Sequence, residues 1–180
     1  MEFVNVGEGE NIWIASSDGD VKRVVELLES GVSVNAQDEQ GYSPLHAAVS
    51  YGHLELIMLL LDRGAAIDLK DTEGDVPLLV CEEVEALELL LSRGASLEVT
   101  NMLNQDIGFK AVEDENEELV EWLVEKKVLT EGRVEELKKE LFPASSFEAN
   151  EEGVVTIDML QEMQDLQKQM EEGNEEGDGQ

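Results

Sequence analysis

An internal period of 33 residues constrains the fold of this 180-residue chain more than any other feature of its sequence. Four turn-forming residues recur at that spacing in identical types: Gly31, Asp38, Gly41 and Pro44 return as Gly64, Asp71, Gly74 and Pro77. A repeat of this length is typical of proteins that stack one small structural unit. The chain is therefore expected to fold as a stack of copies.

Two further copies flank this pair. Residues 12–31 superpose on residues 45–64 when they are shifted forward by one period. A shift of 63 residues places Ala48 and Leu60 on Ala111 and Leu123, which indicates a fourth copy. Because 63 is three short of two periods, we expect the third copy, residues 77–94, to lack about one turn near its inter-helix loop.

Each copy is predicted to consist of a turn, a short helix, a tight loop and a second helix that ends at glycine. In the second copy Ser43 can cap a helix that has Pro44 at its first position, and Gly64 can supply a left-handed C-terminal residue. One helix pair cannot bury its apolar stripe alone, so neighbouring copies must cover it. That stripe is predicted to comprise Leu54, Ile57, Leu60 and Leu61.

These residues resemble the ankyrin repeat, whose pattern is D-x-x-G-x-T-P-L-H-x-A-A-x-x-G-H. The second copy matches it at Asp38, Gly41, Pro44, Leu45, His46, Ala47, Ala48, Gly52 and His53, with Ser43 in place of threonine. The end copies depart from the pattern, with Trp13 at the histidine position and Ile107, Gly108 and Phe109 in place of Pro-Leu-His. The resemblance implies an all-α solenoid of four helix-turn-helix repeats over about residues 5–127.

The charge balance bears on the class of partner. Forty-three acidic residues against twelve basic ones give a net charge of −31, which opposes contact with nucleic acid or an anionic membrane. A basic protein partner fits better, although the same acidity can simply keep the chain soluble and monomeric, as we expect it to be when no partner is bound. The single cysteine and the lack of a signal peptide or spanning segment predict a cytoplasmic or nuclear protein.

No group of residues predicts catalysis, a metal site or a cofactor. In the ankyrin family, histidines at the positions of His46 and His53 bond backbone and hydroxyl groups, so both are expected to be structural. Cys81 occupies the position of Ala48, where a buried, unreactive thiol is expected. The glycines form neither a phosphate loop nor a dinucleotide fingerprint. We therefore expect a protein that is not an enzyme.

The candidate site follows from the resemblance, because ankyrin stacks bind partners through their turn tips and the inner face of their first helices. The matching positions here are Glu39, Gln40 and Tyr42 in the second copy, Thr72, Glu73 and Asp75 in the third, and Asp18, Tyr51, Glu113 and Asp114 on the first-helix face. Tyrosines among carboxylates suit a cationic partner. A purely solvated row of acidic tips is the open alternative.

The C-terminal third breaks the period. Residues 130–142 predict an amphipathic helix, capped by Thr130 and ended by Pro143, that covers the open end of a repeat domain spanning residues 1–142. Residues 143–155 are predicted to be a linker and residues 173–180 a disordered acidic tail. Residues 156–172 predict a possible recognition helix with a stripe of Met159, Met163, Leu166 and Met170, and with Leu160 beside it; this helix could instead dock on the repeats.

Two binding functions remain open. Small acidic ankyrin chaperones of basic ribosomal proteins are similar in size and in having an acidic C-terminal extension, which implies an escort for a ribosomal protein or histone. The other function is a scaffold or regulatory adaptor that binds a specific epitope through the concave face. The two differ in the salt sensitivity that they predict.

Overall fold

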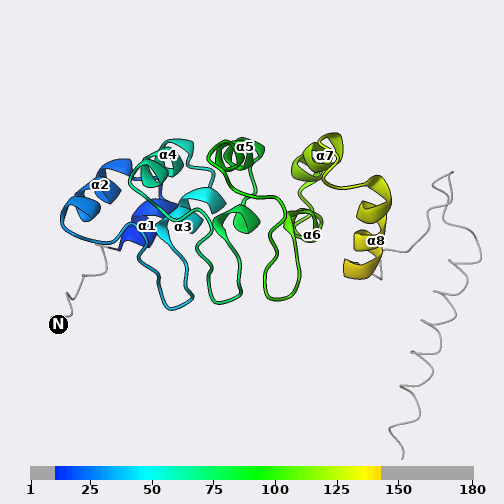
Figure 1. Cartoon of the computed structure of the whole chain (residues 1–180), viewed down its shortest axis with the longest axis horizontal. Coiled ribbons are helices and arrows are strands. Elements are labelled where there is room, and N and C mark those ends of the chain that lie inside the picture. Colours follow the sequence, from blue (N-terminus) through cyan, green and yellow to red (C-terminus); the bar gives the residue numbers. More distant parts are fainter. Residues whose placement is uncertain (1–10, 143–180) are drawn as a thin grey trace, which may run out of the picture. The chain divides into compact units, whose positions relative to one another are not determined.

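The helices of this chain lie in two rows, joined by long loops that project from one side (Figure 1). The computed structural model describes residues 11–142. Within that range the elements are α1 (Ile12–Ser17), α2 (Val21–Glu29), α3 (Pro44–Ser50), α4 (Leu54–Asp62), the 3-10 helix η1 (Pro77–Val80), α5 (Val84–Ser92), α6 (Ile107–Glu113), α7 (Glu117–Glu125) and α8 (Glu131–Leu141). The described residues contain no strand, which confirms the all-α class.

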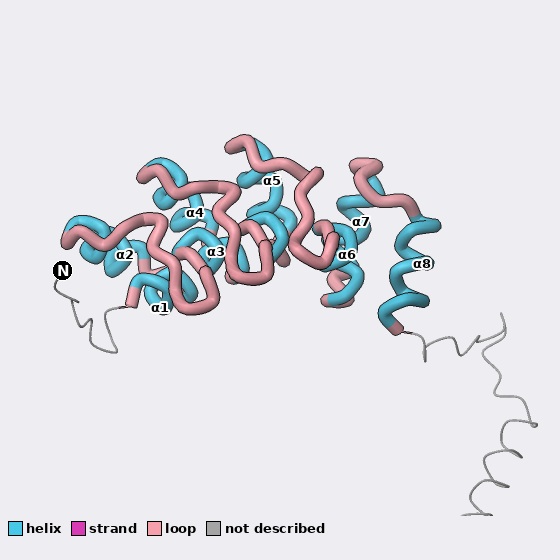
Figure 2. Tube along the Cα trace, turned by 60° about the horizontal axis from the view of Figure 1, so that its bottom comes forward, coloured by secondary structure: helices cyan, strands magenta, loops and turns pink. Residues whose placement is uncertain are grey.

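The two rows follow from the pairing of a first and a second helix in each copy. α1, α3, η1 and α6 pack one after another in the inner row, and α4, α5 and α7 do so in the outer row. Three long loops, which resemble the teeth of a comb, connect α2 to α3, α4 to η1 and α5 to α6 (Figure 2). We call these loops, residues 30–43, 63–76 and 93–106, the fingers.

Side-chain caps fix where most of these short helices begin. Asn11, Asp20, Ser43, Asp106 and Asn116 each accept a hydrogen bond from a backbone N–H in the first turn of their helix. Ser43 and His46 form a reciprocal capping box, and Pro44 stands at the first helical position, as predicted. Because helices of six to nine residues are marginal alone, the caps and the packing together hold them.

The outer helices bury a stripe that differs in part from the predicted one. Ile57 and Leu60 are fully buried as expected, but Leu56 is also fully buried while Leu54 is 39% exposed. The difference arises because α4 packs against both α3 and α5, so the buried face is wider than the predicted stripe.

The third copy departs from the prediction of a short α-helix. Its first helix is the single 3-10 turn η1, and Cys81 follows that turn in extended conformation. Val76 stands at the position of Ser43 and has no hydroxyl to cap the turn, and the three missing residues remove the rest of the helix. Cys81 is nevertheless buried, as expected.

The helix expected in residues 130–142 is present as α8. The Thr130 hydroxyl accepts the Arg133 N–H at 3.2 Å, and Val134 and Leu137 are buried. Among the other elements, α8 packs chiefly against α6 and so extends the inner row. The predicted linker, recognition helix and acidic tail at 143–155, 156–172 and 173–180 lie outside the described residues.

Candidate functional site

The three fingers repeat one hydrogen-bonding scheme. In the first, Asp38 Oδ1 accepts the backbone N–H groups of Gln40 at 3.0 Å and Tyr42 at 2.7 Å. Asp71 repeats this in the second finger with the N–H groups two and four residues later. Asn101 does the same in the third, at 2.9 and 3.0 Å. One carboxylate or amide therefore closes each tip from within.

The fingers are also bonded to one another. The Thr72 N–H donates to the Gln40 carbonyl at 2.9 Å, and the Met102 N–H donates to the Glu73 carbonyl at 3.0 Å. Gly41 has a φ of +79°, and a Cβ there would lie 2.9 Å from the backbone of Asp71. Side chains are thus excluded where adjacent fingers meet, and the tips are held as one surface.

The side chains exposed on that surface are polar or acidic on the first two tips and apolar on the third. Glu39 and Gln40 are exposed on the first tip, and Thr72 and Glu73 are exposed on the second. The third tip is apolar, since Met102 and Leu103 are each 72% exposed. Exposed apolar side chains that lie together are candidates for a contact with a protein partner.

The C-terminal ends of the inner helices add further carboxylates. Asp18 follows α1 as its C-cap, and Glu113 and Asp114 end α6. All three side chains are exposed. A helix C-terminus carries partial negative charge of its own, so these carboxylates intensify a potential that favours cations. Tyr51 lies at the matching end of α3, is 62% exposed and stacks on His53 at 6.3 Å between ring centroids.

We use the name finger row for the exposed residues of the finger tips together with those at the C-terminal ends of the inner helices. It comprises Asp18, Glu39, Gln40, Tyr51, Thr72, Glu73, Met102, Leu103, Glu113 and Asp114. Eight of the ten candidate residues belong to it, and the other two, Tyr42 and Asp75, are placed differently.

Tyr42 is only half-exposed because its ring tilts against His46, 5.0 Å away between centroids. Burial raises the pKa of its phenol above the ordinary value. The ring therefore packs against the start of α3, and only part of it is exposed.

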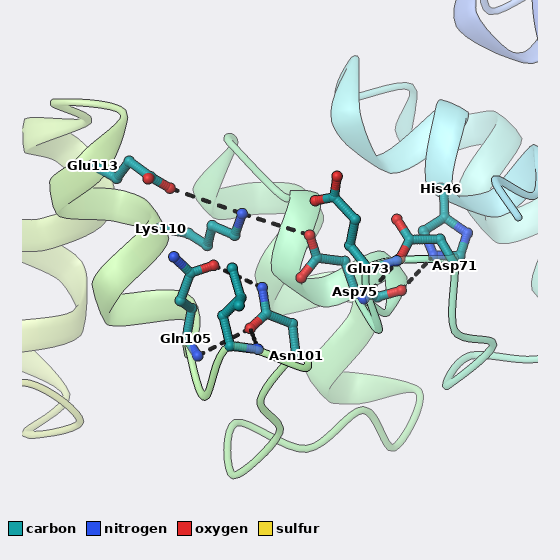
Figure 3. Close-up of polar contacts among 9 residues, drawn as sticks. His46, Asp71, Glu73, Asp75, Asn101, Gln105, Lys110 and Glu113 are labelled. Atoms are coloured by element: carbon teal, nitrogen blue, oxygen red, sulfur yellow. Dashed lines mark hydrogen bonds and ion pairs between the residues drawn. The ribbon is translucent and has the colours of Figure 1, made fainter. Parts of the chain in front are cut away.

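Asp75 differs from the expectation of an exposed tip carboxylate. It is 4% exposed, and its Oδ2 lies 3.5 Å from the Nζ of Lys110 on α6 (Figure 3). Lys110 Nζ is also 3.8 Å from Glu113. Asp75 Oδ1 is buried and has no hydrogen-bond partner among the described residues. Asp75 is thus part of a polar contact between the third and fourth copies, and the expectation that it faces a partner is corrected.

Lys110 is the residue that sequence reasoning overlooked at this site. Asp75 stands at the position of Tyr42, one period on, and Lys110 stands at the position of Ala47, 63 residues on. Charges of opposite sign in place of two uncharged residues in adjacent copies are a signal that could have revealed the pair.

The histidines and the cysteine have the structural roles that were expected. His46 Nε2–H donates to the Asp75 carbonyl at 3.1 Å, while its Nδ1 accepts the Ser43 N–H at 3.2 Å. Burial lowers the pKa of His46, so the neutral ring holds both bonds. Burial raises the pKa of the Cys81 thiol to about 12, which leaves almost no thiolate at neutral pH.

Two features of residues 11–142 bear on other classes of function. That part of the chain contains no cluster of three or more histidine, cysteine or carboxylate side chains able to hold a metal ion. None of its helices has both the length and the apolar character needed to cross a bilayer.

The comparisons with known proteins agree with this geometry. Residues 12–101, half of the chain, match the family model for ankyrin repeats in three copies, so the chain belongs to the ankyrin repeat family. Proteins of this family are generally non-enzymatic protein–protein interaction modules. Membership of this family indicates that the partners are proteins. The matched residues include the first two fingers and most of the inner row.

Individual relatives are similar over shorter stretches. Ankyrin repeat-containing protein P1E11.10 of Schizosaccharomyces pombe is 41% identical over 83 residues, which are 46% of this chain and 40% of that protein. Acyl-CoA-binding domain-containing proteins 2 and 1 of Arabidopsis thaliana are 46% and 43% identical over 37 residues, 21% of this chain and 10% and 11% of their own lengths. The chain therefore matches two fifths or less of each relative.

Proposed function

We propose that this protein binds a basic segment of a protein partner along the finger row and shields its cations, as an escort for a ribosomal protein or histone would. The proposal rests mainly on one observation. Each copy contributes an exposed carboxylate to the row, namely Asp18, Glu39, Glu73 and Asp114, and none of them forms an ion pair with a lysine or arginine of residues 11–142.

Lys110 does not neutralise the charge of these carboxylates. Lys110 lies beside the row, but it is shared between the buried Asp75 and Glu113. A row of uncompensated carboxylates steers a basic partner by Coulomb attraction that is screened over about 8 Å at physiological ionic strength. Binding of this kind is expected to weaken with added salt.

The test is affinity capture from cell lysate at low and high salt, with bound proteins identified by mass spectrometry. Beside the full chain, the finger variant Glu39→Lys/Glu73→Lys/Asp114→Lys is compared with an outer-row control, Glu29→Lys/Glu55→Lys/Glu85→Lys. Both variants change the net charge equally, and all six side chains are exposed. An escort retains its basic partner in the control and loses it in the finger variant and in high salt.

Removal of residues 148–180 tests the C-terminal part of the same proposal. These residues include eleven acidic side chains and one lysine. If they help to mask a basic partner, a chain that ends at Phe147 captures less of it at physiological salt. Equal capture limits the binding site to the repeats.

An adaptor function is supported by a different observation, the apolar third tip. Met102 and Leu103 offer a hydrophobic anchor that salt does not screen. In this case the partner survives high salt and the finger variant, and it is lost when the tip is changed by Met102→Ser/Leu103→Ser. That combination of results would refute the escort proposal.

A further inference from the structure

One position of the outer helices shows that α7 lacks a following outer neighbour among the described residues. Val24, Ile57 and Leu87 occupy equivalent sites on α2, α4 and α5, and all three are fully buried. Val120 is their equivalent on α7 and is only half-buried. The first three helices are each followed by another outer helix, whereas within residues 11–142 no outer helix follows α7. The uncovered surface at Val120 is therefore where the next outer helix would lie.

The last helix does not fill this place. α8 packs chiefly on α6 and so extends the inner row, in the place of a following inner helix. Figures 1 and 2 show α8 beyond α6 and α7 with no described helix continuing the outer row. An open groove of about 510 Å³ remains between α7 and α8. Its lining consists of Val120, Glu121, Val124, Glu125, Val134, Glu131 and Glu135.

The groove has an apolar floor of valines and an acidic rim. Glu121 and Glu125 lie one turn apart on α7, and Glu131 and Glu135 lie one turn apart on α8. All four are exposed, and none forms an ion pair with a cation of residues 11–142. Like charges one helical turn apart repel each other, so the free protein carries a small unfavourable term that cations at the rim would remove.

We propose that this groove, which we call the α7–α8 groove, binds a basic amphipathic helix of a protein partner. The helix takes the place of the absent outer helix, its apolar stripe covers Val120, Val124 and Val134, and its lysines or arginines pair with the rim. Two packed helices bury such a stripe by interdigitation of side chains. This site is separate from the finger row, and the proposal does not rest on the function proposed for that row.

The charge of the rim disfavours binding of a segment of this chain in the groove. Residues 156–172, which lie outside the described residues, carry an apolar stripe but five acidic side chains against Lys168 alone. Placing them between four rim glutamates adds repulsion where a basic helix gains attraction. A second copy of this chain, with its net charge of −31, faces the same opposition.

The experiment uses the full chain with methyl-labelled valines and a defined probe. The probe is a helix-forming peptide of about 18 leucines and lysines with one apolar stripe. A shuffled peptide of the same composition, without the stripe, serves as control. NMR titration with the striped peptide is expected to shift the methyl signals of Val120, Val124 and Val134, and the shuffled peptide is expected to leave them in place.

Charge variants separate this site from the finger row. Glu121→Gln/Glu125→Gln/Glu131→Gln/Glu135→Gln is expected to weaken peptide binding about tenfold, as the loss of several exposed ion pairs implies. The matched control neutralises exposed carboxylates elsewhere: Glu29→Gln, Glu55→Gln, Glu85→Gln and Glu98→Gln. It is expected to change affinity less than twofold, and the finger variant is expected to leave the valine shifts intact.

Three results would overturn the proposal. The first is a titration of the wild-type chain in which the striped peptide shifts no methyl signal of Val120, Val124 or Val134. This result does not depend on the folding of any variant. The second is equal weakening by the groove and control variants. The third is that a peptide of residues 156–172 shifts the same valines at similar or lower concentration, which would make the chain's own segment the occupant.

Discussion

Loss of the Lys110 cation would test the role that the structure gives to Asp75. The substitution is Lys110→Met, which keeps the length and the apolar stem of the side chain and removes only the charge. Asp75 would then be left 4% exposed, with one oxygen already lacking a hydrogen-bond partner among the described residues and the other without its ion pair. The contact between the third and fourth copies should weaken.

The geometry sets the size of the effect. Removal of one partner from a fully buried ion pair costs about 3–5 kcal/mol. Here the Nζ–Oδ2 distance is 3.5 Å, which is long for a charge-assisted bond, and the lysine side chain is 20% exposed, so water reaches the pair. We therefore expect the free energy of unfolding to fall by about 2 kcal/mol.

Urea denaturation can measure this loss, because the two tryptophans lie in the first and fourth copies. Trp13 and Trp122 report the two ends of the repeat stack by fluorescence, and circular dichroism reports the whole. In Lys110→Met the Trp122 transition should move to lower urea at least as far as that of Trp13. The exposed Lys138 gives a control, since Lys138→Met should change stability by less than about 0.5 kcal/mol.

A double-mutant cycle with Asp75→Asn decides the interpretation. If the pair is coupled, the double variant should recover about 1 kcal/mol relative to the sum of the single losses. Additive losses, or a Lys110→Met variant as stable as the wild type, would refute the structural role of the pair.

Three further predictions concern local features of the repeats. Ser43→Ala should cost about 1 kcal/mol of stability in thermal unfolding because it removes the cap of α3, whereas Ser43→Thr should retain it. Gly41→Ala should destabilise more than Gly64→Ala in the same assay: both have positive φ, but only at Gly41 would a Cβ meet the next finger. The Cys81 thiol should resist a thiol reagent at pH 8 until the chain unfolds. Its pKa of about 12 in the folded state exceeds the unfolded value near 9, so its contribution to stability should fall as the pH rises from about 9 to 12. Denaturation of the wild type and of Cys81→Ala across this pH range can detect the loss.

The repeat residues could be predicted well because their roles are local. Asp38 and Asp71 close turns through neighbouring backbone groups, and Ser43 caps a helix that begins one residue later. Such interactions depend on spacing along the chain, which the sequence displays directly. The predicted positions of the exposed tip residues follow from the same local geometry.

Features that depend on neighbouring copies were harder to predict. The position of Asp75 depends on Lys110, thirty-five residues away, and the burial of Leu56 depends on the elements packed against α4. A single copy read alone cannot show which side of its stripe another copy covers. The α7–α8 groove escaped prediction for the same reason, since it exists only because α8 follows the inner row and leaves Val120 half-covered.

The most direct test of the central claim is the rate of association between this protein and its captured partner as ionic strength is varied. The account predicts that the association rate constant of the wild type falls steeply with salt. It also predicts that the Glu39→Lys/Glu73→Lys/Asp114→Lys variant associates much more slowly at low salt than the outer-row control does. An association rate constant that is independent of salt and equal in both variants would contradict binding through an acidic finger row.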